Sequence, residues 1–117
     1  MIIGIGVDMV DVARFQHQIE NSPRLAQRLF SAHERELPIR SLAARYAAKE
    51  ALIKALGGSD GVFWQDIEVP RLGERQAPKY VVTGETEQTL SARGVSSAHL
   101  SLTHDGGFAI AYTVLEG

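Results

Sequence analysis

The feature of this sequence that most constrains its fold is a segment from about Leu42 to Leu56 that is apolar on most sides of a helix. A helix of this kind is largely buried. Small residues recur through it and allow close packing against another element. They are Ala43, Ala44, Ala47, Ala48, Ala51 and Ala55. We expect Ser41 to cap this helix, and Gly57 and Gly58 to end it in a left-handed turn.

The first ten residues alternate in character, which favours a β-strand. Ile3, Ile5, Val7 and Met9 share one face of this strand, whereas Gly4, Gly6 and Asp8 share the other. Glycine has no side chain, so another element can approach the backbone closely on the face that carries Asp8.

Turn and capping residues divide the rest of the chain. Asp11 is a candidate N-cap for a helix at residues 12–21, and Pro23 begins a second helix that reaches residue 30. Ser31 and Glu34 have the spacing of a capping box. The remaining segments are predicted strands at 63–69 and 79–83, a helix at 84–94, and strands at 97–104 and 108–116 joined by a hairpin turn. The resulting order, β-α-α-α-β-β-α-β-β, predicts an α+β protein with an antiparallel sheet packed on the long helix.

Composition limits the possible functions. The chain has 117 residues and no cysteine, which fits one domain over residues 1–117 and excludes disulfides and thiolate metal sites. We find neither a membrane-length apolar run nor the pattern of a signal peptide, so we expect a cytoplasmic protein without a membrane partner. Residues 14–54 hold eight basic and four acidic residues, which favours an acidic partner. Aromatic residues do not interleave with these charges, so nucleic acid is not the expected partner.

Several charged residues remain open to two interpretations. Glu50 and Lys54 are four apart in the long helix and could form an ordinary surface ion pair, worth about 0.2–0.5 kcal/mol. Asp8 could cap the following helix or pair with Arg14. Alternatively, Asp8 and Glu50 could hold Mg²⁺, which binds through one or two carboxylates together with waters and substrate phosphates. His104 shares its strand face with Leu100 and Leu102, where a structural histidine is the ordinary alternative to a site residue.

Three segments carry a family resemblance: GIGVDMVDVARF at residues 4–15, RYAAKEALIKALG at 45–57 and LSLTHDGGFAIA at 100–111. Together, in this order and spacing, they resemble the holo-acyl-carrier-protein synthases, the small 4′-phosphopantetheinyl transferases. The resemblance implies an Mg²⁺-dependent enzyme that moves the 4′-phosphopantetheine arm of coenzyme A to a serine of an apo acyl carrier protein or carrier domain, releasing adenosine 3′,5′-bisphosphate. It also implies a homotrimer with active sites in the clefts between subunits.

The resemblance assigns roles to particular residues. Asp8 and Glu50 match the metal ligands and, with Lys54, form the expected catalytic set. The positions expected to line the coenzyme A site are Arg45, Lys49, Lys54 and His104, of which His104 can come from a neighbouring subunit. Arg14, Arg24 and Arg28 lie in the region that docks the acidic carrier protein.

The sequence departs from the family pattern at Tyr46, in the loop at residues 57–61, in the short connection before the long helix and in the hairpin THDGG, and none of these departures touches the proposed metal ligands. Tyr46 stands where the family usually has phenylalanine, and residues 57–61 replace its usual loop, which leaves the coenzyme A contacts of this loop open. Two other functions are alternatives to the transferase: a non-catalytic module that binds carrier proteins, and a different Mg²⁺ enzyme that hydrolyses a nucleotide phosphate. The presence of Asp8, Glu50, Lys54 and His104 together argues against the non-catalytic module.

Overall fold

The computed structural model describes every residue except 72 and 74. Its elements are β1 (Ile2–Asp11), α1 (Val12–Asn21), α2 (Pro23–Leu29), the short 3-10 helix η1 (Glu34–Glu36), α3 (Ile39–Leu56), a second 3-10 helix η2 (Trp64–Asp66), β2 (Ile67–Glu68), β3 (Val81–Val82), α4 (Gly84–Ala92), β4 (Ser97–Asp105) and β5 (Phe108–Glu116). The predicted order of helices and strands is confirmed.

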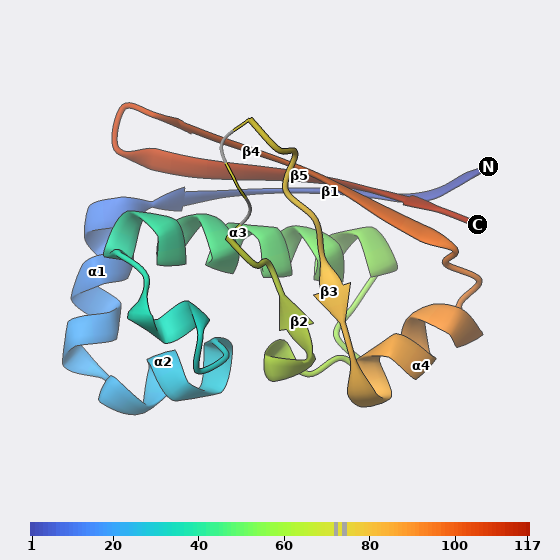
Figure 1. Cartoon of the computed structure of the whole chain (residues 1–117), viewed down its shortest axis with the longest axis horizontal. Helices are drawn as coiled ribbons and strands as arrows, with labels where there is room; N and C mark the ends of the chain where they lie inside the picture. Colours follow the sequence, from blue (N-terminus) through green and yellow to red (C-terminus); the bar gives the residue numbers. More distant parts are fainter. Residues whose placement is uncertain (72, 74) are drawn as a thin grey trace.

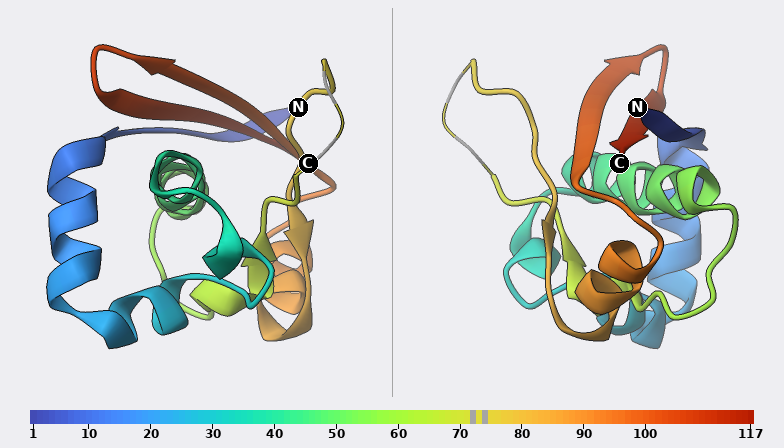
Figure 2. Two further views of the ribbon diagram at one scale, coloured as in Figure 1. Left: turned by 60° about the vertical axis from the view of Figure 1, so that its left-hand side comes forward. Right: turned by 90° about the vertical axis from the view of Figure 1, so that its right-hand side faces the viewer.

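A three-stranded antiparallel sheet covers one side of the molecule, with strand order β1-β5-β4. Figure 1 shows α3 running beneath this sheet, and the left view of Figure 2 shows α3 end-on, with α1, α2 and the β2–α4 region on its other sides. The predicted burial of the long helix is confirmed, because Ala43, Ala44, Ala47 and Ala51 are almost inaccessible to solvent. The alanines let the sheet and the surrounding helices approach one helix from several directions.

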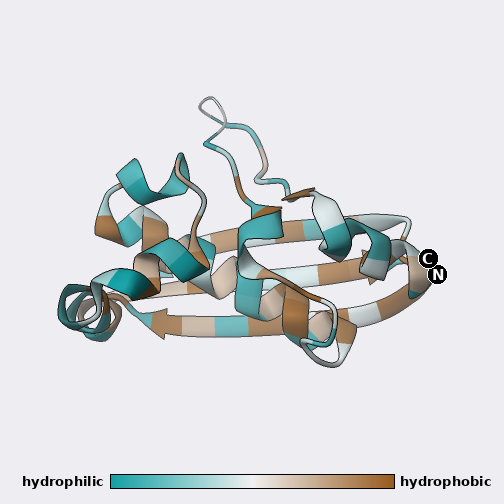
Figure 3. Cartoon of the chain, turned by 90° about the horizontal axis from the view of Figure 1, so that it is seen from below, coloured by the Kyte–Doolittle hydropathy of each residue, from teal (hydrophilic) through white to brown (hydrophobic). Residues whose placement is uncertain are grey.

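The two faces of β1 differ in what they contact. A Cβ atom built on Gly4 or Gly6 would clash with the carbonyl oxygens of Ala55 and Ala51, so the glycines let β1 lie directly on α3. The opposite face carries the larger apolar side chains, which are 45–61% exposed. They are Ile3, Ile5, Val7 and Met9. Seen from below in Figure 3, β1 is hydrophobic along most of its length.

Local signals fixed most of the element ends. The side chain of Asp11 accepts a hydrogen bond from the Arg14 backbone N–H at 3.1 Å and caps α1. Ser31 and Glu34 form the reciprocal bonds of a capping box, at 3.1 and 3.2 Å. The hairpin turn between β4 and β5 places Gly106 and Gly107 at φ of 55° and 82°. A two-residue type I′ turn requires positive φ at both central residues.

One predicted helix start and the extent of two predicted strands are wrong. The helix α3 begins at Ile39, directly after Pro38, and not at Leu42 after a Ser41 cap. Its C-terminal end agrees with the prediction, since Gly57 is left-handed with φ of 84°.

The strands predicted at 63–69 and 79–83 shrink to the two-residue pairs of β2 and β3. The residues before β2 turn instead into η2. There the Asp66 carboxylate accepts hydrogen bonds from the backbone and hydroxyl of Thr86 in α4, at 3.2 and 2.9 Å. These contacts connect different parts of the chain, so strand propensity did not reveal them.

Candidate active site

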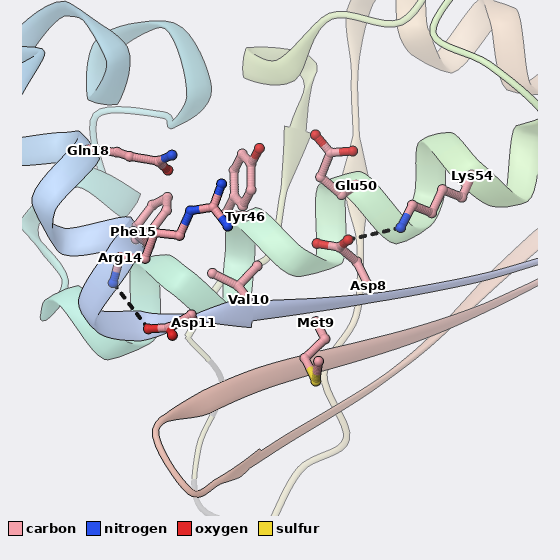
Figure 4. Close-up of a pocket in the computed structure, with 10 residues that line it drawn as sticks. All are labelled: Asp8, Met9, Val10, Asp11, Arg14, Phe15, Gln18, Tyr46, Glu50 and Lys54. Carbon is pink, nitrogen blue, oxygen red and sulfur yellow. Dashed lines mark hydrogen bonds and ion pairs between the residues drawn. The ribbon is translucent and has the colours of Figure 1, made fainter.

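A pocket of about 320 Å³ lies where the end of β1, the first turns of α1 and the middle of α3 meet. Its lining includes Asp8, Arg14, Tyr46, Glu50 and Lys54, drawn in Figure 4. The catalytic residues predicted from the sequence are therefore brought together, although Asp8 is more than forty positions before Lys54 in the chain. The packing of β1 on α3 explains this, because Asp8 shares its strand face with the glycines that contact the helix.

Asp8 and Lys54 form an ion pair across this contact. The Lys54 Nζ lies 3.0 Å from Asp8 Oδ1 and also donates to the Val7 carbonyl oxygen at 3.1 Å. The Asp8 side chain is only 15% exposed, whereas that of Lys54 is 52% exposed. Because Asp11 supplies the cap of α1 and Lys54 supplies the ion pair, neither ordinary role considered for Asp8 is the one observed.

Glu50 faces the same pocket from α3, one turn before Lys54 (Figure 4). Partial burial raises the pKa of Glu50, and the negative charge of Asp8 raises it further, while the Tyr46 hydroxyl and the Lys54 ammonium act in the opposite direction. Two carboxylates that face one pocket offer hard oxygen ligands to a cation.

Asp8 and Glu50 fit Mg²⁺ by their chemistry. Both offer hard oxygen ligands, and two carboxylates occupy only part of the six-coordinate shell of this ion, which usually keeps waters and takes substrate phosphates. Within the described part of the chain, no group of three or more histidine, cysteine, aspartate or glutamate side chains is arranged to hold a metal ion.

The docking residues predicted from the sequence lie on the first two helices. Arg14 lines the pocket and its side chain is exposed, with the guanidinium reaching toward Tyr46 and Phe15 in Figure 4. Arg24 and Arg28 are exposed on α2, outside the lining of this pocket. A cationic side chain thus stands at the pocket itself, and two more lie on the next helix.

Lys49 was expected in the coenzyme A site, but its side chain is completely buried on another side of α3. Its Nζ donates to the Leu29 carbonyl oxygen at 2.6 Å, to Glu34 Oε1 at 2.7 Å and to the Trp64 carbonyl oxygen at 3.2 Å. Burial lowers the pKa of Lys49, although Glu34 favours the charged form. These bonds tie α2, η1 and η2 to the central helix.

Arg45 and His104 also lie apart from the Asp8–Glu50 pair. Arg45 is buried and donates from Nε to the Val69 carbonyl oxygen at 2.9 Å, beside a second pocket of about 230 Å³. Burial lowers its pKa. His104 is exposed near the end of β4, opposite Ala109. Lys54 is therefore the one residue of the predicted coenzyme A set that this chain brings to the first pocket.

The sequence did not predict that Tyr46 lines the pocket or that Glu34 pairs with Lys49. The sequence marks Tyr46 as a departure from the family pattern, and Glu34 as a capping residue. The spacing of Tyr46, four residues before Glu50, could have indicated that both face one pocket. The partner of Lys49 had no comparable local signal, because Glu34 reaches it from a different element.

Comparison with known proteins agrees with this geometry. A model of the 4′-phosphopantetheinyl transferase superfamily matches residues 4–113. A holo-acyl-carrier-protein synthase of Clavibacter michiganensis subsp. michiganensis is 58% identical over 117 residues, which is 100% of this chain and 98% of that protein.

Solved structures show the same fold. The holo-acyl-carrier-protein synthase of Neisseria meningitidis superposes with a TM-score of 0.90 at 27% identity, covering 100% of both chains. The synthase of Helicobacter pylori in complex with coenzyme A gives a TM-score of 0.81 at 29% identity, covering 96% of this chain and 99% of that one. The resemblance and the α+β fold predicted from the sequence are both confirmed, and the chain belongs to the 4′-phosphopantetheinyl transferase superfamily.

Proposed function

We propose that this protein is a holo-acyl-carrier-protein synthase, which transfers the 4′-phosphopantetheine arm of coenzyme A to a serine of an apo acyl carrier protein. The observation that carries the proposal is the meeting of Asp8, Glu50 and Lys54 in one pocket. Relatives over the full length of the chain bear this enzyme's name, and one solved relative binds coenzyme A. The whole chain, residues 1–117, then acts as one transferase domain.

The proposed reaction is a phosphoryl-type transfer. The serine oxygen of the carrier protein bonds to the phosphorus that bears the pantetheine arm, and the bond from that phosphorus to the oxygen of adenosine 3′,5′-bisphosphate breaks. Such a step needs positioning and neutralisation of negative charge more than covalent help from the enzyme. Its nucleophile belongs to the partner, so this chain need not supply one.

Three residues of the pocket have tasks in this reaction. Asp8 and Glu50 would hold Mg²⁺, which when bound neutralises pyrophosphate charge and polarises the reacting phosphorus. Lys54 binds the phosphates as a mobile point charge, since its half-exposed ammonium can leave Asp8 for a stronger anion. The serine proton passes to a carboxylate of the site or to a water that a carboxylate orients.

Arg14, Arg24 and Arg28 would dock the acidic carrier protein. Arg14 stands at the edge of the pocket, so a carrier held there presents its serine to the phosphates. A planar guanidinium suits this task because it binds carboxylates in a bidentate way.

A homotrimer is part of the proposal. The exposed apolar face of β1, together with Phe108 and Tyr112 on β5, is the kind of surface that a second copy of the chain would cover. Assembly would also allow His104 of one copy to approach the pocket of another, since His104 is exposed and lies away from the first pocket within one chain.

The described part of the chain holds no helix with the length and hydropathy that crossing a bilayer demands. The cytoplasmic location stays a prediction.

One assay separates the transferase from the two alternatives. The protein is incubated with coenzyme A, Mg²⁺ and an apo acyl carrier protein, and the intact mass of the carrier is measured. We expect the carrier to gain one phosphopantetheine only when all components are present. Binding of the carrier without a mass change would favour a non-catalytic module. Hydrolysis of coenzyme A or nucleotide without carrier modification would favour a phosphohydrolase.

A further inference from the structure

Tyr46 and Glu50 are one helical turn apart on α3, and both line the pocket (Figure 4). Side chains four residues apart on a helix are neighbours on its surface. In Figure 4 the hydroxyl end of Tyr46 and the carboxylate of Glu50 lie on the same side of the helix. The phenol is thus the polar side chain that α3 itself places next to Glu50 on the side away from Lys54.

Packing fixes the position of this hydroxyl. The Tyr46 ring stacks on Trp64, with centroids 5.5 Å apart and an angle of 5° between the planes, and it contacts Phe15 at 5.2 Å. Phe15 in turn meets Phe30 edge-on at 6.1 Å inside the core. Rings held on two sides have little freedom to move, so the hydroxyl is presented to the pocket in one place.

The chemistry of the pair gives the hydroxyl a proton to donate. Tyrosine side chains ordinarily keep their proton at neutral pH. A phenol that lines the same pocket as a carboxylate one helical turn away can donate this proton to it.

We propose that Tyr46 is a positioning residue, whose hydroxyl holds one oxygen of Glu50 so that the other is aimed toward Asp8 for a divalent cation. This role rests on the proposed function of Asp8 and Glu50. Hydrogen-bond partners of metal-ligating side chains orient the ligand, and losing one typically weakens metal binding by about 10–100-fold.

A purely structural role for Tyr46 is the competing interpretation. In that case the ring matters for its packing against Trp64 and Phe15, and the hydroxyl is only solvated and has no role toward Glu50. The substitution Tyr46→Phe separates the two roles, because it keeps the ring and removes the hydroxyl. A structural role would leave the metal affinity of this variant unchanged.

The test measures binding of Mn²⁺, as a probe for Mg²⁺, to the protein without coenzyme A or carrier. We expect Tyr46→Phe to bind Mn²⁺ about tenfold more weakly than the wild type while its Tm stays close to the wild-type value. Adding Mn²⁺ should also perturb the tyrosine absorbance of the wild type, and this change should be lost in the variant. Equal Mn²⁺ affinity in the two proteins would overturn the positioning role.

Tyr80→Phe is the matched control. The Tyr80 hydroxyl is bonded to the Ala48 carbonyl oxygen at 2.5 Å and to Thr113 Oγ1 at 2.6 Å, outside the lining of the pocket. This variant should lose thermal stability and keep its Mn²⁺ affinity, the reverse of the result expected for Tyr46→Phe. A wild type that binds no Mn²⁺ would instead overturn the metal site, and the role of Tyr46 with it.

Discussion

The Lys49 Nζ lies 2.7 Å from Glu34 Oε1, and the two side chains are 0% and 1% exposed. The next residue in the helix, Glu50, opens on the pocket. Each residue of an α-helix is turned by about 100° from the one before it, so one charge can face the interior and its neighbour the site. The buried pair joins η1 to α3 and so helps to fix the helix that carries Glu50 and Lys54.

Removing one member of this pair should strongly destabilise the protein. Lys49→Met would leave the Glu34 carboxylate buried without its cation, which typically lowers the free energy of unfolding by about 3–5 kcal/mol. Denaturant unfolding at a fixed protein concentration measures the change. Lys79→Met, at an exposed lysine, is the control and should be nearly silent. A loss below about 1 kcal/mol for Lys49→Met would contradict the stabilising role of this pair.

The metal ligands can be tested by near-isosteric substitutions. Asp8→Asn and Glu50→Gln each remove one anionic ligand while preserving shape. We expect each variant to need more Mg²⁺ and to lose at least about tenfold in turnover, equivalent to ~1.4 kcal/mol in the barrier. Titration of transfer activity against Mg²⁺ gives both quantities. Titration curves like that of the wild type in both variants would refute the assignment.

The pH dependence of stability should reveal the environment of Glu50. Its pKa is raised in the folded protein, first by burial and then by Asp8, so the folded state keeps the Glu50 proton to higher pH than the unfolded chain does. Below the ordinary glutamate pKa of about 4.3, both states hold the proton and ionisation costs no stability. As the pH rises through the raised pKa, the free energy of unfolding falls.

Glu50→Gln should remove the part of the pH-dependent fall in the free energy of unfolding that comes from ionisation of Glu50. Without divalent cations, the variant should have a higher Tm than the wild type near neutral pH, and the difference should shrink as the pH is lowered toward about 4. Thermal unfolding across this range measures it. Glu87→Gln, at an exposed glutamate of α4, is the control. A Tm difference that does not change with pH would mean that ionisation of Glu50 is not its cause.

Charge reversal at Arg14 tests carrier docking. Arg14→Glu should raise the KM for the carrier protein several-fold and leave the KM for coenzyme A nearly unchanged. Added salt should weaken carrier binding by the wild type, because exposed charges are screened. Arg24→Glu and Arg28→Glu should have smaller effects, since both residues lie outside the pocket. Lys79→Glu is the control for a change of net charge. An unchanged KM for the carrier protein in Arg14→Glu would contradict the docking role.

Assembly through the exposed face of β1 can be tested by placing a charge there. Ile5 is 55% exposed in the single chain, and Ile5→Lys should disrupt an interface that buries it. Light scattering should show a wild-type trimer and a variant with smaller mass and reduced activity. Val81→Lys changes an apolar side chain of β3 that is 46% exposed and should leave the mass unchanged. An active wild-type monomer at assay concentrations would overturn the trimer.

The sequence alone determined the features that depend on neighbours along the chain. The alanines of residues 43–55 predicted a buried helix, the Asp11 and Gly57 caps placed element ends, and the two glycines at Asp105-Gly106-Gly107 predicted the hairpin turn. Spacing also put Glu50 and Lys54 on one side of the helix. These signals are readable because helix periodicity, capping and turn conformation are local in origin.

Only the tertiary structure decided which partner each charge meets. The ion pair of Lys54 is with Asp8 of β1, although Glu50 was its neighbour by spacing, and Lys49 turns inward to Glu34. Glycine at positions 4 and 6 allows another element to pack closely on β1, but the sequence did not predict that this element is α3. The physical reason is that contacts between elements depend on how whole surfaces fit, and that fit sums many weak interactions from distant parts of the chain.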